Sequence, residues 1–404
     1  MGENMNNNGE KNNQKSVSSE SFAKIYDILI IGAGSIGVPL SFYLAKRGMK
    51  VAVIEKNSSV GRGQNRAAIG GIRATHSDPA KIKIGLETLK IMREMETHYG
   101  YDVDWIEGGY LFPVYNEKDE ITLKKLLKIQ KSYGLNIDWI SEQKVQKLIP
   151  GINENNLRGG TYSPEDGSAS PLKTIDAFYM LAKENNVDFY FNEEVIDAEL
   201  SEEKIEVIKT TNRKYKSGLV IDCSGGNAKE VGKIFNLDLP VFPESHEAGI
   251  TEPVERFFDP MIVDVRPENG SANYYFYQNK EGQIVFCITP APNIPGKDCD
   301  NTSVFLPQVI KRMINLYPRL RNIRVRRTWR GLYPMTPDGF PIIGYSKEVK
   351  NLFLTIGMCG QGFMLGPGLG KILSEIIVDK TKIYDDILEE LSLYRKFDQD
   401  EMLK

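Results

Sequence analysis

The chain has 404 residues, and its 51 Lys and Arg against 54 Asp and Glu give a formal net charge of −3. This balance lacks the basic surplus of nucleic-acid-binding proteins, so no nucleic-acid partner is expected. Four widely spaced cysteines without a CxxC pair disfavour zinc ribbons, iron–sulfur clusters and disulfide scaffolds, and three histidines without ligand spacing predict no metal site. The length suffices for two domains, and the composition, 41% hydrophobic and 26% charged, is typical of a globular protein.

The N-terminal region shows no targeting or membrane signal. Residues 1–22 are rich in Asn, Ser, Lys and Glu and contain no apolar run, which predicts a disordered tail rather than a signal peptide. The stretch 28–45 carries no charge, but glycines and a proline interrupt it, so we expect no membrane span. Together with cysteine usage that fits reduced thiols, these features favour a cytoplasmic protein.

The clearest motif is a strand, a glycine turn, a helix and a second strand over residues 27–55. A strand expected over 27–31, apolar from 28 onward, precedes the pattern G-x-G-x-x-G. A helix is expected over 35–47, and a second strand over 51–55 ends in Glu55. The glycines permit a tight turn and a close approach of the backbone to a pyrophosphate, while the helix N-terminus attracts phosphate. Glu55 lies about 20 residues beyond the glycines, where a carboxylate accepts from an adenosine ribose hydroxyl and repels the extra phosphate of NADP. The predicted dinucleotide contacts are Gly32, Ala33, Gly34, Ser35, Ile36, Gly37, Glu55 and Lys56.

Further elements follow from local patterns in chain order. Asp78 and Pro79 suit the N-cap and first turn of a helix, whose apolar face is Ile82, Leu86, Leu89, Met92 and Met95. Strands are expected within 103–115, helices over 118–133 and 171–185, and short strands near 188–191, 195–200, 203–209 and 219–223. Residues 273–277 and 283–289 alternate as in a hairpin, and 352–356 form a strand before a glycine-rich turn and a helix over 362–378.

Three motifs lie outside the dinucleotide unit: Gly70-Gly71-Ile72-Arg73, a T-P-D-G-F-P-I-I-G segment at 336–344, and the glycine-rich turn at 357–363. With the N-terminal fingerprint, they make the chain resemble the FAD-dependent amine and amino-acid oxidoreductases of the D-amino-acid oxidase superfamily, over roughly residues 25–380. The resemblance is greatest to the branch that holds the sarcosine oxidase beta-subunit, glycine oxidase and dye-linked proline dehydrogenase. It implies an α/β fold with a Rossmann-like FAD-binding domain from discontinuous segments and a second sheet-and-helix substrate domain. The expected boundaries are 23–95, 155–240 and 340–385 for the FAD domain, 96–154 and 241–339 for the substrate domain, and 386–404 for a C-terminal tail or helix.

The resemblance also implies where FAD is held. Glycines allow the backbone of the turn at 357–363 to run beside the isoalloxazine ring, and the helix that follows directs its positive end at the ring. The expected additional FAD contacts are Asn65, Arg66, Gly70, Gly71, Val195, Gly225, Gly226, Gly357, Gly360, Gln361, Gly362, Phe363 and Met364.

Three residues are candidates for catalysis: Arg73, Tyr333 and Tyr275. In the resembled family Arg73 lies near the flavin, where a cation stabilises the reduced form, and Tyr333 occupies a substrate-facing position. Tyr275 is preferred over Tyr274 and Tyr277, which we expect on the opposite face of the strand.

Departures from the family refine the expectation. Gly331 replaces the flavin-linking cysteine of monomeric sarcosine oxidases, so FAD is expected to be non-covalent. Met364 replaces their carboxylate-binding lysine, so simple sarcosine oxidation is not expected. Arg66 replaces a histidine and Gly70 an arginine, so the flavin environment is expected to differ from theirs. No lysine follows Tyr275 at the spacing of the family's oxygen-activating lysine, where Phe286 and Cys287 stand instead, which favours a dehydrogenase over an oxidase.

The expected reaction is hydride transfer to flavin N5 from a carbon that carries the nitrogen of a secondary amine, imino acid or amino acid. One alternative is a flavin-dependent dehydrogenase of 2-hydroxy acids or glycerol phosphate, for which His76 or His246 would supply the base. Another alternative is a non-catalytic FAD-binding subunit of an electron-transfer complex. An electron-acceptor subunit is a further possible partner.

Overall fold

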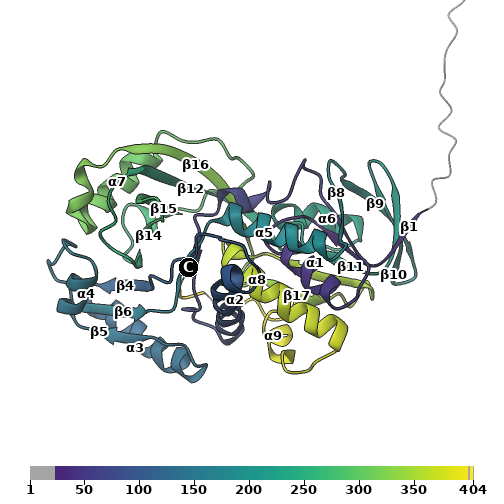
Figure 1. Ribbon diagram of the computed structural model, residues 1–404, viewed down its shortest axis with the longest axis horizontal. Coiled ribbons are helices and arrows are strands. Elements are labelled where there is room, and N and C mark those ends of the chain that lie inside the picture. The colour runs from purple at the N-terminus through teal and green to yellow at the C-terminus, as the bar shows by residue number, and fades with distance from the viewer. Residues whose placement is uncertain (1–22, 399–400, 404) are drawn as a thin grey trace, which may run out of the picture.

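The computed structural model describes residues 23–398 and 401–403, so the expected tail at 1–22 lies outside the described residues. The chain forms two lobes, each built on a sheet (Figure 1). The first lobe holds a mixed sheet with strand order β17-β18-β11-β1-β2-β8, to which β10 and β9 add at β11. Its strands are β1 (Lys24–Ile31), β2 (Val51–Ile54), β8 (Asp188–Tyr190), β9 (Val195–Ser201), β10 (Lys204–Thr210), β11 (Lys214–Asp222), β17 (Ile342–Tyr345) and β18 (Leu352–Ile356).

The centre of this sheet is parallel and buried on both faces, which explains its continuous apolar strands. β1 pairs in parallel with β2 and β11, and β11 pairs in parallel with β18. Helices α1 (Gly37–Lys46), α5 (Pro171–Glu184) and α8 (Gly362–Ser374) contribute to the core on one face. The β9–β10 hairpin and α6 (Ala228–Ile234) pack on the other face.

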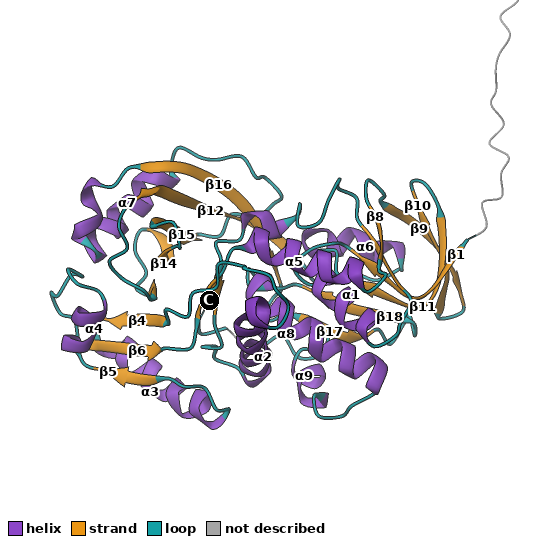
Figure 2. Cartoon of the chain, viewed as in Figure 1, coloured by secondary structure: helices purple, strands orange, loops and turns teal. Residues whose placement is uncertain are grey.

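The second lobe is a sheet with strand order β16-β12-β15-β14-β13-β4-β6-β5 (Figure 2). Its strands are β4 (Tyr110–Val114), β5 (Asp138–Ile140), β6 (Gly159–Ser163), β12 (Phe242–Pro253), β13 (Met261–Asp264), β14 (Gly270–Gln278), β15 (Gln283–Ala291) and β16 (Val325–Met335). Helices α4 (Glu142–Leu148) and α7 (Phe305–Leu316) cover one face, and α3 (Glu117–Ser132) covers part of the other. The remainder of that second face is turned toward the first lobe.

The lobes are joined by α2 (Pro79–Thr97), by a small sheet of β3 (Gly71–Ile72) and β7 (Gly167–Ser168), and by the C-terminal part with α9 (Asp385–Glu390). This arrangement confirms the α/β fold with a Rossmann-like domain from discontinuous segments and a second sheet-and-helix domain. The domain boundaries stay predictions, but β6 falls within the segment 155–240 assigned to the FAD domain and pairs with β4 and β5 in the second lobe.

Several local expectations are confirmed in detail. The Asp78 side chain accepts from the Lys81 backbone N–H as the N-cap of α2, and Pro79 opens the helix. β14 and β15 form the expected antiparallel hairpin. The expected strand within 103–115 is shorter, because 110–114 form the strand and Ile106 makes only an isolated bridge with Ser168. The expected helix 362–378 changes from α to π geometry over 375–379. Across residues 23–398 and 401–403, none of the helices has the length and apolar composition needed to cross a bilayer.

Candidate active site

A single long cavity of about 610 Å³ lies between the two lobes. Its first-lobe wall comes from the turn after β1, from the loop around η1 (Gln64–Ala67), and from the segment before α6. Its second-lobe wall comes from β12, β13, β15 and β16, and the turn before α8 closes one side. The cavity therefore runs from the dinucleotide motif to the face of the second sheet that is turned toward the first lobe. An extended cofactor requires a cavity of this length.

The dinucleotide end of the cavity is shaped by the first glycine turn. Gly32 has φ +105°, and a Cβ there would lie 2.6 Å from the Cys223 carbonyl oxygen, so the turn requires glycine. A Cβ on Gly34 would meet no atom within 4 Å and would project into open space, where a ligand can approach the backbone. Helix α1 begins without a side-chain cap, which leaves its N-terminal N–H groups available to phosphate.

Glu55 at the end of β2 is buried and also lines this end of the cavity. One carboxylate oxygen accepts from the Ala33 N–H at 2.9 Å, and the other accepts from the backbone and side-chain N–H groups of Asn57 at 2.8 and 2.6 Å. The oxygen that accepts from Ala33 keeps a second lone pair, so Glu55 both fixes the glycine turn and can accept from a ribose.

The structure brings most of the expected FAD contacts to this one cavity. Those that line it are Gly32, Gly34, Ser35, Ile36, Glu55, Lys56, Asn65, Arg66, Gly70, Gly71, Val195, Gly225, Gly360, Gln361, Gly362, Phe363 and Met364. Ala33, Gly37, Gly226 and Gly357 are not part of the lining. Gly37 serves packing instead, because a Cβ there would lie 2.1 Å from the Gly32 carbonyl oxygen.

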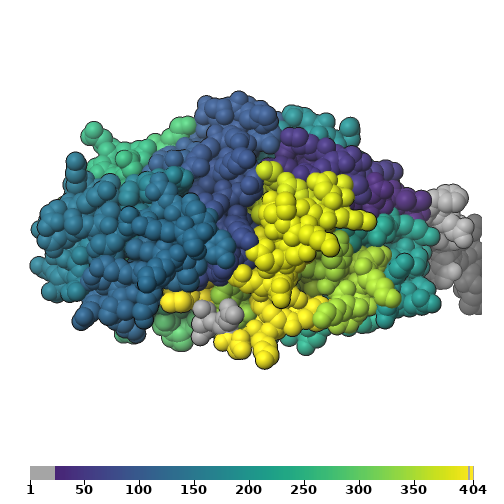
Figure 3. All heavy atoms as spheres, turned by 90° about the horizontal axis from the view of Figure 1, so that it is seen from below, coloured from purple at the N-terminus to yellow at the C-terminus, as the bar shows by residue number. Residues whose placement is uncertain are grey.

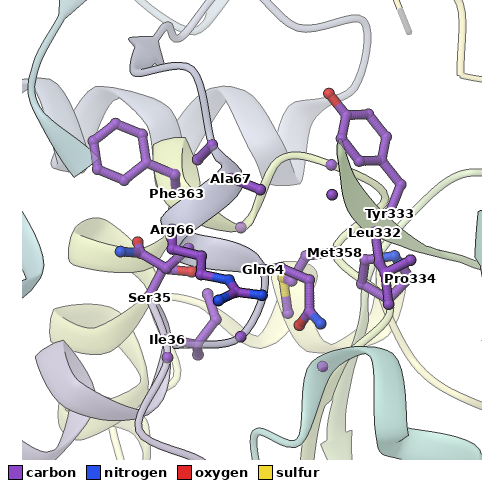
Figure 4. Close-up of a pocket in the computed structure, with 18 of the residues that line it drawn as sticks. Ser35, Ile36, Gln64, Arg66, Ala67, Leu332, Tyr333, Pro334, Met358 and Phe363 are labelled. Atoms are coloured by element: carbon purple, nitrogen blue, oxygen red, sulfur yellow. The ribbon is translucent and has the colours of Figure 1, made fainter. Parts of the chain in front are cut away.

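The middle of the cavity carries polar groups suited to a cofactor. Figure 4 shows the Arg66 side chain between the turn of Ser35 and Ile36 and the side chains of Gln64 and Met358. Asn65 Oδ1 and Gln361 Oε1 are buried in this lining, and neither has a hydrogen-bond partner among the residues that the structure describes. Since buried polar atoms are normally paired, these orphans and the open approach at Gly34 fit a bound FAD.

The far end of the cavity is an aromatic cluster on the second sheet. The Tyr275 and Tyr333 hydroxyls lie 2.7 Å apart, and either can be the donor. His246 stacks on Tyr333 with ring centroids 3.7 Å apart and planes 11° apart. Cys287 stands opposite Tyr275 in the ladder, and burial raises the pKa of its thiol to about 12. These four residues all line the cavity.

The position of Tyr277 corrects the expectation for the neighbouring tyrosines. Tyr274 points to the opposite core, as expected, but Tyr277 belongs to the same core cluster against which Tyr275 packs. The reason is the two-residue period of a strand, which places 275 and 277 on one face. The Tyr277 hydroxyl donates to the Ile69 carbonyl at 2.5 Å and does not line the cavity.

His246 was missed as a site residue of the amine reaction, because a lone histidine within a strand of mixed composition has no spacing signal. It comes to the cavity through β12, where it pairs with Gly331 of β16. Burial, and secondarily the charge of Arg330, lower the pKa of His246 to about 3, so the imidazole is unprotonated at neutral pH. Neither ring nitrogen makes a hydrogen bond within the described part of the chain. His76 is buried elsewhere and does not line the cavity.

Arg73 is 7% exposed and lines the cavity close to this cluster. Its guanidinium donates to two backbone carbonyls, those of Thr75 and Leu403, the latter at 2.6 Å. No carboxylate of the described residues forms an ion pair with it, and burial lowers its pKa. Arg73 is therefore a buried cation at the cavity wall. The neutral carbonyl groups fix its orientation but do not cancel its charge.

Gly331 and Met364 also lie in the lining, as the family positions imply. A Cβ on Gly331 would lie 2.4 Å from the Cβ of Ala67, so β16 and η1 are too close there for a larger residue.

A Rossmann-like lobe and a second sheet that share one long cavity define a dinucleotide-dependent oxidoreductase. The model of the FAD dependent oxidoreductase family (DAO) matches residues 27–376. The chain therefore belongs to the FAD-dependent oxidoreductase family and is an enzyme, which confirms the resemblance and sets aside a non-catalytic subunit.

Comparison with individual proteins gives distant relatives. Glycine oxidase from Geobacillus kaustophilus is 25% identical over 370 residues, which cover 89% of this chain and 95% of that protein. Mitochondrial dimethylglycine dehydrogenase from Homo sapiens is 23% identical over 388 residues, but the chain spans only 44% of its length. The crystal structure of L-proline dehydrogenase from P. horikoshii has a TM-score of 0.86 and 28% identity, and covers 92% of this chain and 98% of that one.

Proposed function

We propose that this enzyme oxidises the C–N bond of a secondary amine, imino acid or amino acid, and that a cyclic imino acid or N-alkyl amino acid suits it best. One observation carries the proposal: a buried guanidinium and an aromatic cluster with an unprotonated imidazole share one end of the cavity. The guanidinium can bind the carboxylate of such a substrate, and the aromatic cluster can contact its alkylated nitrogen. The similarity to a structure of L-proline dehydrogenase supports the same substrate class.

FAD, when bound, supplies the hydride acceptor. Arg73 holds the substrate carboxylate by charge-assisted hydrogen bonds, which fixes the carbon–nitrogen bond in the cavity. The paired hydroxyls of Tyr275 and Tyr333 offer a donor and an acceptor to the nitrogen, and their rings exclude water.

His246 offers a neutral hydrogen-bond acceptor to the substrate nitrogen. An amine at neutral pH is mostly protonated, whereas loss of hydride from the adjacent carbon requires a free lone pair on nitrogen, so the ammonium loses its proton to water and the neutral amine is the reacting form. An imidazole with a pKa of about 3 is too weak a base to take that proton, but its ring nitrogens make no hydrogen bond within the described residues, so one of them can accept a hydrogen bond from the amine N–H. The product imine then hydrolyses in solution.

His246 also favours a second candidate, the oxidation of a 2-hydroxy acid or glycerol phosphate. That reaction needs a base at the alcohol, and the structure places this histidine, unlike His76, in the cavity lining. The substrate screen below separates the two candidates.

The test is anaerobic bleaching of the enzyme-bound flavin by L-proline, sarcosine, N-methyl amino acids, glycine, D-amino acids, 2-hydroxy acids and glycerol phosphate. We expect rapid bleaching by a secondary-amine acid and slow bleaching by glycine and the hydroxy acids. Arg73→Ala should raise the substrate concentration needed for half-maximal reduction, slow reduction and lower the flavin potential. Preferred bleaching by a hydroxy acid, or an Arg73→Ala variant with unchanged kinetics and potential, would contradict the proposal.

A further inference from the structure

Residues 401–403 insert into the junction between the lobes, beside the first turn of α2. Leu403 is 3% exposed and packs in the core cluster of Tyr110, Phe112 and Val263. Figure 3 shows C-terminal residues (yellow) lying against the blue part of the chain that contains α3 and its neighbours. The segment therefore forms part of the wall between the second sheet and α2.

Glu401 anchors the segment through contacts with α2 and the loop before it. Its side chain is fully buried and forms an ion pair with Lys81, whose side chain is also fully buried. The same carboxylate accepts from the Ser77 hydroxyl at 2.7 Å and from the Leu403 N–H at 3.0 Å. These bonds fold the segment back on itself and direct the Leu403 carbonyl into the junction.

That carbonyl accepts from Arg73 Nη2 at 2.6 Å. Arg73 also donates to the Thr75 carbonyl. Asp166 holds the loop that carries this carbonyl, because its carboxylate accepts from the Ala74 N–H and the Thr75 hydroxyl. A guanidinium is planar, so two acceptors on different segments fix both its position and its plane. The remaining N–H groups then keep one orientation relative to the cavity.

We propose that Glu401 and Leu403 are positioning residues for the substrate's carboxylate site: they hold the Arg73 guanidinium in the plane that presents its free N–H groups to the cavity. This inference rests on the proposed role of Arg73 in binding that carboxylate. It assigns the segment a part in substrate affinity, although it lies outside the motifs of the resemblance.

The test is a double-mutant cycle between Leu403→Asp and Arg73→Ala in the holoenzyme. Leu403→Asp places a charge in an apolar core and expels the segment, whereas Met402→Ala, at a side chain 55% exposed, is the matched control. The first readout is the dissociation constant of acetate, a carboxylate that cannot be oxidised, followed by the flavin spectrum. The second readout is KM against kcat for the substrate found in the screen.

We expect Leu403→Asp to weaken acetate binding and raise KM by about tenfold, the order of one charge-assisted hydrogen bond, with a smaller change in kcat. Met402→Ala should leave both unchanged. In the Arg73→Ala background, Leu403→Asp should have no further effect, because the segment acts through the guanidinium. If the two effects multiply instead, the segment has only a general structural role and the inference is wrong.

Two controls separate the possible failures. An unchanged acetate affinity in Arg73→Ala alone would contradict the proposed function, whereas a loss in Arg73→Ala without any loss in Leu403→Asp would contradict only the role of the segment. If Leu403→Asp does not fold, Glu401→Gln serves in its place, with Glu401→Gln/Lys81→Met as the charge-matched variant. If both of these variants bind acetate with the wild-type affinity, the inference is also wrong.

Discussion

His246 acquires its chemistry from its neighbours rather than from its sequence context. β12 and β16 place it under the Tyr333 ring, where its side chain is buried in the cavity wall. Burial disfavours the charged imidazolium, so the residue stays neutral and can accept a hydrogen bond where an exposed histidine would be partly protonated. The site thus has a neutral hydrogen-bond acceptor suited to an amine N–H, together with a cation, Arg73, suited to a carboxylate.

The same burial predicts a pH dependence of stability. The pKa of His246 is about 3 in the folded state against 6.5 for the free side chain, so between these values the unfolded chain binds a proton that the folded chain does not. The stability that the unprotonated His246 gives the folded state is fully present above pH 6.5 and is lost as the pH falls toward 3. From this group the free energy of unfolding falls by at most about 1.4 kcal/mol per pH unit. Unfolding by denaturant at several pH values from 7 down to about 5 measures this slope.

In His246→Gln the free energy of unfolding should depend less steeply on pH over this range. His98→Gln is the matched control, since His98 is exposed at the end of α2 and should leave the slope as in the wild type. Equal slopes in all three proteins would show that His246 titrates normally in the folded enzyme.

A second prediction at the residue scale concerns attachment of the cofactor. Gly331 carries no thiol, and a Cβ there would collide with Ala67, so β16 cannot offer the flavin-linking side chain that the related oxidases use. We expect heat or acid to precipitate the protein and release FAD into the supernatant, where absorbance and chromatography detect it. Flavin that stays with the washed precipitate would contradict this expectation.

At the scale of elements, α8 depends on small residues to reach its place between α1 and α2. A Cβ on Gly366 would lie 2.0 Å from the Ser35 carbonyl oxygen, and one on Gly368 would lie 2.3 Å from the Ile84 carbonyl oxygen. The Gly368 N–H also donates to the Thr88 hydroxyl at 3.0 Å, which ties α8 to α2. Because these glycines carry no side chain, α8 packs close to the turn before α1 and to the backbone of α2. The N-terminus of α8 therefore reaches the cavity.

Gly368→Val should push α8 away from α2, lower the thermal midpoint and weaken FAD retention. Overpacking against backbone typically costs about 1–3 kcal/mol or more. Lys125→Val is the control, because Lys125 is exposed on α3 and does not line the cavity. A Gly368→Val protein with wild-type melting temperature and flavin content would show that α8 does not need this close approach.

Elements with local signals were predictable from the sequence, and long-range pairings were not. The β1–α1–β2 unit, the Asp78 cap and the β14–β15 hairpin each depend on residues close in sequence, and all three are confirmed. The pairing of β12 with β16 joins residues such as His246 and Gly331 across 85 positions, and Leu403 meets Arg73 across 330. No local pattern encodes such contacts, so the imidazole of His246 in the cavity and the residues that hold Arg73 appear only in the structure.

At the scale of the whole molecule, the cavity between the lobes predicts how the reduced enzyme is reoxidised. Reduction of O₂ begins with electron transfer that creates an anion, which a nearby cation stabilises. Among the described residues the lysines that line the cavity are Lys56, at the dinucleotide end, and Lys297, which pairs with Glu230 and Asn227. The sheet face around Tyr275 carries Ala248, Val263, Cys287 and Thr289 instead of an amine.

Two cations lie near this face: Arg330, which pairs with Asp298, and Arg73, which in our proposal is engaged by the substrate or product carboxylate. We therefore expect O₂ to reoxidise the substrate-reduced enzyme more slowly than an artificial dye, by about tenfold or more, equivalent to ~1.4 kcal/mol in the barrier. Stopped-flow mixing of the anaerobically reduced enzyme with O₂ or with dye measures both rates. Photoreduced enzyme without substrate is the control, since Arg73 is then free of carboxylate and its reaction with O₂ should be faster than in the product complex. Equally fast reoxidation by O₂ in all of these experiments would identify the enzyme as an oxidase and contradict the dehydrogenase prediction.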